Sequence, residues 1–206
     1  MLRASRGGSL GTLGVGGLPT VTLVTPATAP DLSVLLLLSG LSEHRRNLGE
    51  DPRCGLMVTG APVSDNPQTA PRLSLSGRAF QVPGTEDAAG RRRWLAAHPY
   101  AEAYAGFADF ALWRLVPERA QFIGGFAAAH RLDLTAFLPP AEAVAAVMAA
   151  EEEMIAAFAD VTAVDVDGCD RVTDGRSTRV AFAQAVTNAD DLRAALDHLD
   201  HGGWIT

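Results

Sequence analysis

The stretch Tyr104–Phe126, which reads YAGFADFALWRLVPERAQFIGGF, does most to decide the fold of this 206-residue chain. Aromatic and aliphatic side chains recur along it and are interrupted by single charged residues. This pattern predicts two strands, at residues 108–114 and 119–126. Because the second ends in Gly124-Gly125, we expect a bulge or a close backbone approach where the chain leaves the sheet.

The flanking sequence predicts further short strands joined by tight turns. The clearest is Arg72–Val82, RLSLSGRAFQV, in which apolar or small residues alternate with polar ones, as in a strand with one buried face. Gly16-Gly17 marks a hairpin turn. The other predicted strands are Ser9–Val15, Pro19–Thr25, Ser33–Leu38 and Gly55–Thr59. Since no regular helical crossovers separate these segments, we expect an antiparallel barrel of about six strands.

Two short helices are predicted between the strands. The first is Leu41–Glu50, with Ser42 as its N-cap and with Leu41, Arg45 and Leu48 on one face. The second is Glu86–Ala97, in which Trp94 should pack inward and the arginines at 91–93 should face solvent.

A second, smaller unit is predicted after the Leu138-Pro139-Pro140 break, so the expected domains are residues 1–135 and 139–206. Its predicted elements are helices at 141–159 and 188–200 and strands at 162–166 and 178–182. We therefore expect a small α/β domain behind the barrel.

The amino-acid composition argues against several classes of function. A net charge of −7 argues against a nucleic-acid partner, which needs a basic surface. All basic residues are arginine, which excludes a lysine Schiff base. Cys54 and Cys169 lie far apart without CxxC spacing, which favours a reducing compartment. The first residues hold too many glycines for a signal peptide, and Val34–Leu38 is too short to span a membrane. We expect a cytoplasmic protein without a membrane partner.

Two motifs around Arg72–Val82 complete a family resemblance. Leu41–Pro52 reads LSEHRRNLGEDP, and Phe122–Arg131 reads FIGGFAAAHR. In this order and spacing the chain resembles the haem-utilisation branch of the pyridoxamine 5'-phosphate oxidase-like split barrels. The resemblance implies a split barrel over residues 8–132 and a small appended domain over 140–206.

The resemblance implies a phosphate site for flavin mononucleotide (FMN). In split-barrel flavoproteins a Ser-Arg-Lys-like triplet at a helix start and a strand arginine hold the phosphate. The matching positions here are Ser42, Glu43 and His44 on the helix and Thr22 on the strand. Uncharged side chains therefore replace two permanent cations, and the site is degenerate unless Arg45 compensates.

The resemblance also implies a haem site. In this branch a histidine after the last barrel strand ligates the haem iron, and His130 holds that place. Asp109 resembles an acidic residue that reaches the haem ligand across a dimer interface, where it would fix the imidazole tautomer. Arg72 and Arg78 are candidate partners of haem propionates or of a flavin.

Each of these residues also has a purely structural interpretation. His130 could be a surface histidine in a linker, Asp109 could form a salt bridge with Arg114 or Arg119, and the arginines at 72 and 78 could belong to a solvated strand face. The C-terminal segment has Glu152 where the family has a histidine, which favours a structural role for that domain. The Asp-x-Asp-Gly run at 165–168 lacks the ligand spacing of an EF-hand.

Three functions follow, in order of preference. The first is haem binding in iron or haem utilisation, with oxygen-dependent haem degradation as an open question. The second is an FMN-dependent oxidoreductase, and the third is a non-catalytic binding or regulatory dimer. Relatives pair across a large face, and we expect a homodimer in which apolar strands such as Val34–Leu38 supply the interface.

Overall fold

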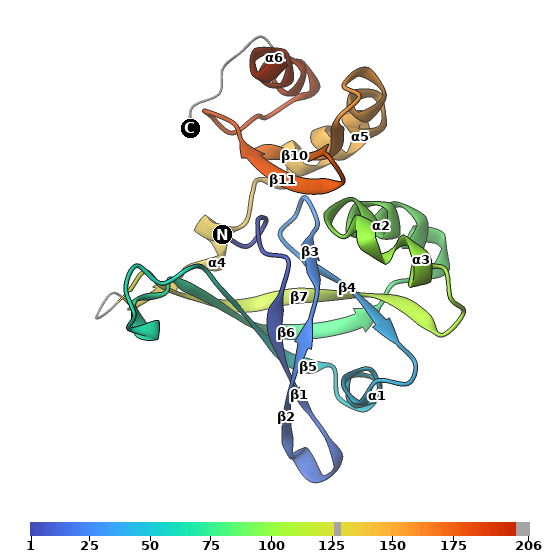
Figure 1. The fold of residues 1–206 in the computed structure, drawn as a ribbon, viewed down its shortest axis with the longest axis vertical. Coiled ribbons are helices and arrows are strands. Elements are labelled where there is room, and N and C mark those ends of the chain that lie inside the picture. The colour runs from blue at the N-terminus through green and yellow to red at the C-terminus, as the bar shows by residue number, and fades with distance from the viewer. Residues whose placement is uncertain (126–128, 201–206) are drawn as a thin grey trace. The chain divides into compact units, whose positions relative to one another are not determined.

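The computed structural model describes residues 1–125 and 129–200, and the chain divides into two compact units, Met1–Leu138 and Pro139–Thr206 (Figure 1). Of the predicted elements, Phe126 lies outside the described residues, as do residues 201–206 of the C-terminal domain. Each unit has its own hydrophobic core.

The first unit is built on one antiparallel sheet of eight strands in the order β2-β1-β5-β6-β7-β4-β3, with β8 also paired to β7. Its strands are β1 Gly8–Leu13, β2 Pro19–Val24, β3 Pro26–Thr28, β4 Val34–Ser39, β5 Arg53–Thr59, β6 Arg72–Gln81, β7 Phe110–Ile123 and β8 Ala129–Leu132. The antiparallel prediction is confirmed, whereas the count of six strands is wrong, because the short strands β3 and β8 also join the sheet.

Strand β7 is one continuous strand of 14 residues where two had been predicted. Pro117 lies between the two predicted segments and cannot donate a backbone hydrogen bond to a ladder. The partner strand shifts register between Ser76 and Gly77, and Gly77 pairs with Pro117. A Cβ on Gly77 would lie 2.0 Å from the Val116 carbonyl oxygen, so the glycine lets the two backbones pass closely at this bulge.

The sheet buries its inner face in the barrel core and part of its outer face under helices. Alternate residues of β4 point to the two sides: Leu36 packs in the barrel core, and Leu35 and Leu37 pack with Trp94 beneath α2 (Gly84–Ala97). Residues 34–38 are thus at most 7% exposed within a single chain, so the expectation that this strand supplies a dimer interface is wrong.

Helix α2 and the turns that follow it, η3 (Pro99–Ala101) and α3 (Glu102–Ala105), cover this outer area. Trp94 packs inward as predicted, and its indole nitrogen donates to the Thr25 carbonyl oxygen at 2.8 Å. Arg93 is buried rather than solvent-facing, so the prediction for that arginine is wrong, because the buried side of α2 is wider than the apolar pattern suggested.

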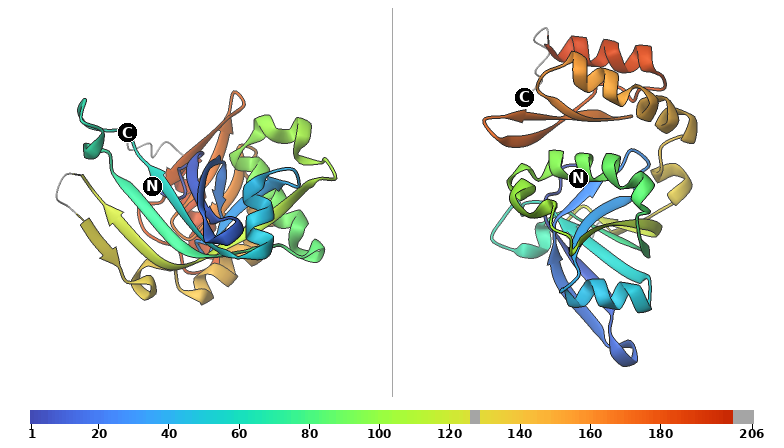
Figure 2. Two further views of the ribbon diagram at one scale, coloured as in Figure 1. Left: turned by 90° about the horizontal axis from the view of Figure 1, so that it is seen from below. Right: turned by 90° about the vertical axis from the view of Figure 1, so that its right-hand side faces the viewer.

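Helix α1 (Glu43–Glu50) lies beside the hairpin formed by β1 and β2, whose turn includes η1 (Val15–Gly17) (Figures 1 and 2). Ser42 occupies the N-cap position, but its hydroxyl donates to the Ser39 carbonyl oxygen at 2.8 Å and does not cap the helix. Leu41 precedes the helix and is exposed, so it does not share the buried face of Leu48.

The second unit consists of a three-stranded antiparallel sheet and two helices. Its elements are α5 Ala141–Ala157, β9 Val161–Asp165, β10 Gly168–Thr173, β11 Arg176–Ala181 and α6 Ala189–Asp200. The short helices α4 (Leu134–Phe137) and η2 (Pro67–Thr69) belong to the first unit. Sequence reasoning missed β10, because GCDRVT looks like a polar turn. Asn188 caps α6, accepting from the Asp191 backbone N–H at 2.9 Å, as predicted.

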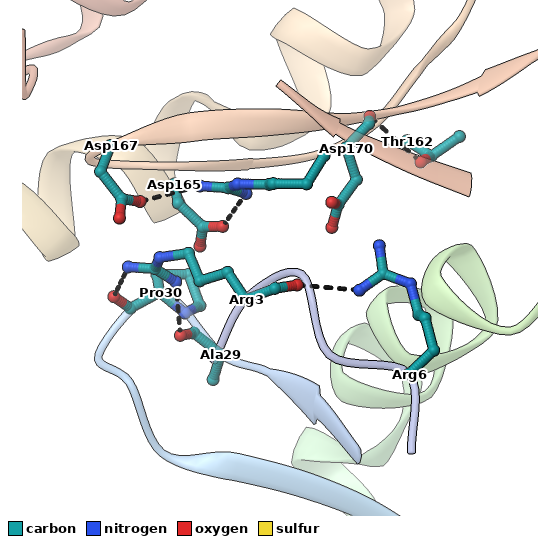
Figure 3. Close-up of polar contacts among 9 residues, drawn as sticks. Arg3, Arg6, Ala29, Pro30, Thr162, Asp165, Asp167 and Asp170 are labelled. Atoms are coloured by element: carbon teal, nitrogen blue, oxygen red, sulfur yellow. Dashed lines mark hydrogen bonds and ion pairs between the residues drawn. The ribbon is translucent and has the colours of Figure 1, made fainter. Parts of the chain in front are cut away.

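The acidic run at the β9–β10 turn is held by an arginine. Arg179 donates to Asp165 at 2.5 Å and to Asp167 at 2.8 Å, while the Thr162 hydroxyl donates to the Asp170 carbonyl oxygen at 3.2 Å (Figure 3). In the first unit, the same figure shows the Arg3 guanidinium donating to the carbonyl oxygens of Ala29 and Pro30. Within the described residues, no cluster of three His, Cys, Asp or Glu side chains suits a metal ion.

One helical stretch, Leu134–Ala157, has the length and apolar composition of a membrane span, which by itself is weak support for one. Within it, α5 buries five side chains in the core of the second unit, namely Ala143, Val144, Val147, Ala150 and Met154. One face of α5 thus packs against the core of the second unit.

Candidate functional site

Helix α1 is fastened to the hairpin by two sets of side-chain hydrogen bonds. The Asn47 amide nitrogen donates to the hydroxyls of Thr12 at 3.1 Å and Thr20 at 2.9 Å. One turn earlier on the helix, His44 Nδ1 lies 3.0 Å from the Thr22 hydroxyl oxygen. Thr12, Thr20 and Thr22 all lie on the inner face of the sheet, which is why one side of α1 reaches each of them. Thr22 and His44, which only the family resemblance had placed in one site, are thus direct neighbours in the structure.

The pair is uncharged at neutral pH. Partial burial lowers the pKa of His44 below its usual 6.5, and the nearby Glu43 carboxylate only partly opposes this effect. A hydroxyl and a neutral imidazole that satisfy each other do not suit a phosphate dianion. The Ser42 hydroxyl is also turned away, toward Ser39. These residues therefore do not fit the FMN phosphate.

Arg45 does not join this pair. It lines a cavity of about 1030 Å³ between the hairpin turn and α1, which we call the hairpin cavity. Neither Thr22 nor His44 lines it. The lining comprises residues 13–18 and Thr20 of the hairpin, residues of α1 that include Arg45 and Asn47, and Gln81 and Trp113 of the sheet. The predicted phosphate set is thus divided between two places.

Two side chains that line the hairpin cavity have buried nitrogen atoms without a hydrogen-bond partner among the described residues. Among the described residues, no hydrogen bond or ion pair is made by the Arg45 side chain, and its Nε is buried. Trp113 is 5% exposed, and its indole nitrogen has no acceptor within the described chain. Sequence reasoning missed this cavity, because it forms only when the Gly16-Gly17 turn, α1 and the β6–β7 pair come together.

His130 lies on β8 at the other end of β7. It pairs with Phe122, which in turn pairs with Leu73, so all three belong to the inner face of the sheet. Its side chain is exposed and makes no hydrogen bond within the described part of the chain. A free, accessible imidazole of this kind fits the haem-ligand role.

The two candidate arginines point to the opposite side of the sheet. Arg72 and Arg78 alternate with the buried residues of β6 and so lie on its outer face. Arg72 donates to the carbonyl oxygens of Gln68 and Ala70, both at 3.2 Å, and Arg78 forms an ion pair with Glu118. One chain therefore does not bring these arginines to His130.

Asp109 is also remote from His130 within one chain. It precedes β7 and accepts a hydrogen bond from the Ser39 hydroxyl at 2.7 Å. The alternative salt bridge with Arg114 does not form, since Arg114 lies 3.5 Å from Asp31 instead. From Phe110 to Phe122, the partner of His130, β7 runs for roughly 40 Å at about 3.3 Å per residue. Within one chain, Asp109 therefore lies far from His130 along β7.

The cysteines are inert thiols. Burial raises the pKa of Cys54 to about 12 and that of Cys169 to about 11. Neither side chain supplies a thiolate near neutral pH, so thiol redox chemistry is not favoured here.

A sequence model of the CREG β-barrel family matches residues 10–138, which is most of the first unit. The chloroplastic haem oxygenase HOZ of Arabidopsis thaliana is 33% identical over 113 residues, which cover 55% of this chain and 34% of that protein. The chain thus spans about a third of the length of this curated relative.

Two solved structures extend the likeness over both units. A protein of unknown function from Agrobacterium tumefaciens superimposes with a TM-score of 0.75 at 28% identity, covering 96% of this chain and 91% of that one. A haem-binding protein from Mycobacterium smegmatis superimposes with a TM-score of 0.61 at 26% identity, covering 96% and 92%. The resemblance to haem-utilisation split barrels that the motifs indicated is confirmed.

Proposed function

This chain belongs to the CREG β-barrel family, and we propose that it binds haem in iron or haem utilisation. The observation that carries the proposal is a free, exposed imidazole, His130, at the position where the sequence motif places an iron ligand. The names of two relatives, the haem oxygenase from Arabidopsis and the haem-binding protein from Mycobacterium, support it.

The residues that would hold haem are His130 as the iron ligand, with Asp109, Arg72 and Arg78 as polar partners. Haem, when bound, supplies the oxygen chemistry. The chain would position it, and the two arginines would offer planar donors to its carboxylates. The residues of β8 and the inner face near Phe122 would exclude water from one side of the ligand.

We propose that the site is completed by a second copy of the chain. His130 faces the inner side of the sheet and the arginines face the outer side, so a single chain cannot gather them around one haem. The uncovered outer face suits such pairing. It combines small side chains with exposed apolar ones, namely Ser9, Gly11, Val21, Leu23, Gly55, Met57, Ser74 and Ser76.

Light scattering on the eluted protein tests the dimer. We expect twice the chain mass of 21.6 kDa for the unaltered protein and a single-chain mass for the double variant L23E/M57E. Val63→Glu places one such negative charge at another exposed apolar residue and should leave the dimer intact. A single-chain mass for the unaltered protein at micromolar concentration would refute the dimer.

A haemin titration tests the function. The unaltered protein should develop a Soret band that saturates at one haem per chain, and His130→Ala should lose it. His198→Ala removes an exposed histidine of α6 and serves as the matched control. Equal Soret bands in the two variants would show that His130 is not the ligand, and no band in any of the proteins would refute haem binding.

We further propose that bound haem is degraded in the presence of oxygen, as the name of the Arabidopsis relative suggests. With ascorbate as the electron donor and catalase present, the Soret band should fade in air and persist under nitrogen. Persistence in air would leave binding without degradation, as in the non-catalytic dimer considered from the sequence. FMN-dependent oxidation is not favoured, because Thr22 and His44 form a neutral pair.

We assign the protein to the cytoplasm.

A further inference from the structure

We propose that the hairpin cavity binds a small amphiphilic organic acid, that is, a molecule with a flat apolar body and one anionic group. The proposal does not rest on haem binding, because His130, Asp109, Arg72 and Arg78 do not line this cavity. Its volume of about 1030 Å³ is at the upper end of the range for small-molecule sites.

Arg45 indicates that the ligand carries an anionic group. Four other arginines of the first unit have acidic partners: Arg53 contacts Asp51, Arg78 contacts Glu118, Arg91 contacts Asp87 and Arg114 contacts Asp31. Arg45 has no partner among the described residues, although its Nε is buried. A half-buried cation without a counter-ion is costly, and an anionic ligand would satisfy it with charge-assisted hydrogen bonds.

The acidic residues of the cavity limit the ligand to one negative charge. Asp51 is already paired with Arg53, which holds the pKa of the Asp51 carboxyl down at about 2. Glu43 and Glu50 also line the cavity and are exposed, so water screens them without removing their repulsion of a second anionic charge. A monoanion is therefore preferred to a phosphate dianion.

The exposed apolar residues of the hairpin turn and the Trp113 indole indicate that the ligand has an apolar body. Val15 is 99% exposed and Leu18 is 68% exposed, and both line the cavity together with Trp113. Gly16 and Gly17 have φ angles of +70° and +77°, which let the chain reverse tightly and hold these side chains at the rim. A flat apolar molecule would cover this exposed surface while its anionic end meets Arg45.

Two fluorescent probes with the same aromatic body test the proposal on the full chain. The first is 8-anilinonaphthalene-1-sulfonate, which carries one sulfonate, and the second is N-phenyl-1-naphthylamine, which lacks it. We expect saturable binding of the sulfonate probe at one site per chain. Arg45→Gln should weaken that probe by about tenfold or more and leave the neutral probe unchanged.

Further variants separate charge, apolar contact and folding. Arg45→Lys should retain most of the affinity for the sulfonate probe, and Arg119→Gln, an exposed arginine of β7, should have no effect. Leu18→Asn should weaken both probes. If Arg45→Gln leaves the sulfonate probe unaffected, or if Val63→Asn at an exposed apolar position outside the cavity lowers binding in place of Leu18→Asn, the proposal is wrong. Circular dichroism of each variant establishes that the fold is retained.

Discussion

Restoring two cations at the Thr22–His44 pair should convert the neutral pair into a phosphate site. In the double variant T22R/H44K, an arginine on β2 and a lysine on α1 replace side chains whose polar atoms lie 3.0 Å apart. Two cations at this spacing can both reach one phosphate group. Both positions are half-buried, so their charges would be screened less than at a fully exposed site.

The magnitude follows from the hydrogen bonds gained. Each charge-assisted bond contributes about 1.5–3 kcal/mol, so two should tighten FMN binding by about a hundredfold or more. Riboflavin has the same ring without the phosphate and should gain little. The exchange removes one hydrogen bond from the folded chain, which costs about 0.5–1.5 kcal/mol and leaves the protein folded.

Quenching of flavin fluorescence measures both dissociation constants. Glu102→Lys, at an exposed position on α3, raises the net charge by the same amount as the double variant and serves as the control for a general charge effect. If that control tightens FMN equally, or if the double variant improves riboflavin as much as FMN, the pair is not a phosphate subsite. Submicromolar FMN binding by the unaltered protein would refute the premise that the neutral pair rejects phosphate.

Three further predictions concern stability. His98 is fully buried between the Pro26 carbonyl oxygen and the Tyr100 hydroxyl, and burial lowers its pKa. Because the unfolded chain binds the proton at a higher pH than the folded chain, the free energy of unfolding measured by urea titration should fall as the pH drops below about 6.5. This fall should be less steep in His98→Gln than in the control His198→Ala. Gly77→Ala would place a Cβ 2.0 Å from the Val116 carbonyl oxygen and should cost about 1–3 kcal/mol or more in thermal unfolding, whereas Gly106→Ala meets nothing within 4 Å and should be near neutral. Asn47→Ala removes both bonds to Thr12 and Thr20 and should cost about 1–3 kcal/mol, and an unchanged denaturation midpoint would show that these bonds do not fasten α1.

The sequence supports predictions that depend on local periodicity. The alternation in β6 and the inward packing of Trp94 follow directly from side-chain pattern, and both are observed. Local periodicity did not predict that β7 is one continuous strand. That continuity depends on a register shift in the partner strand opposite Pro117, and no property of β7 alone reveals that shift.

The candidate site shows the same division between local and non-local information. Thr22 and His44 were brought together by a motif whose spacing encodes a strand and a helix that pack on each other, and they are neighbours. Arg45 follows His44 directly in sequence, yet it lines a different space, because successive residues of a helix diverge by about 100°. The hairpin cavity needs four elements and had no sequence signal beyond the Gly16-Gly17 turn.

The haem residues carry the most informative discrepancy. A motif places His130, Asp109, Arg72 and Arg78 in one functional set, whereas strand parity and the length of β7 separate them within a chain. Side chains on opposite faces of a sheet cannot converge through rotamer changes, because the backbone of the sheet lies between them. A one-residue register shift would move them to the other face, but it would also expose the entire inner face. A second copy that presents its outer face, or its Asp109 end, to the β8 region of the first resolves the conflict without any change of register. Haem binding and dimer formation should therefore be lost together in the double variant L23E/M57E, while His130→Ala should lose haem and remain a dimer.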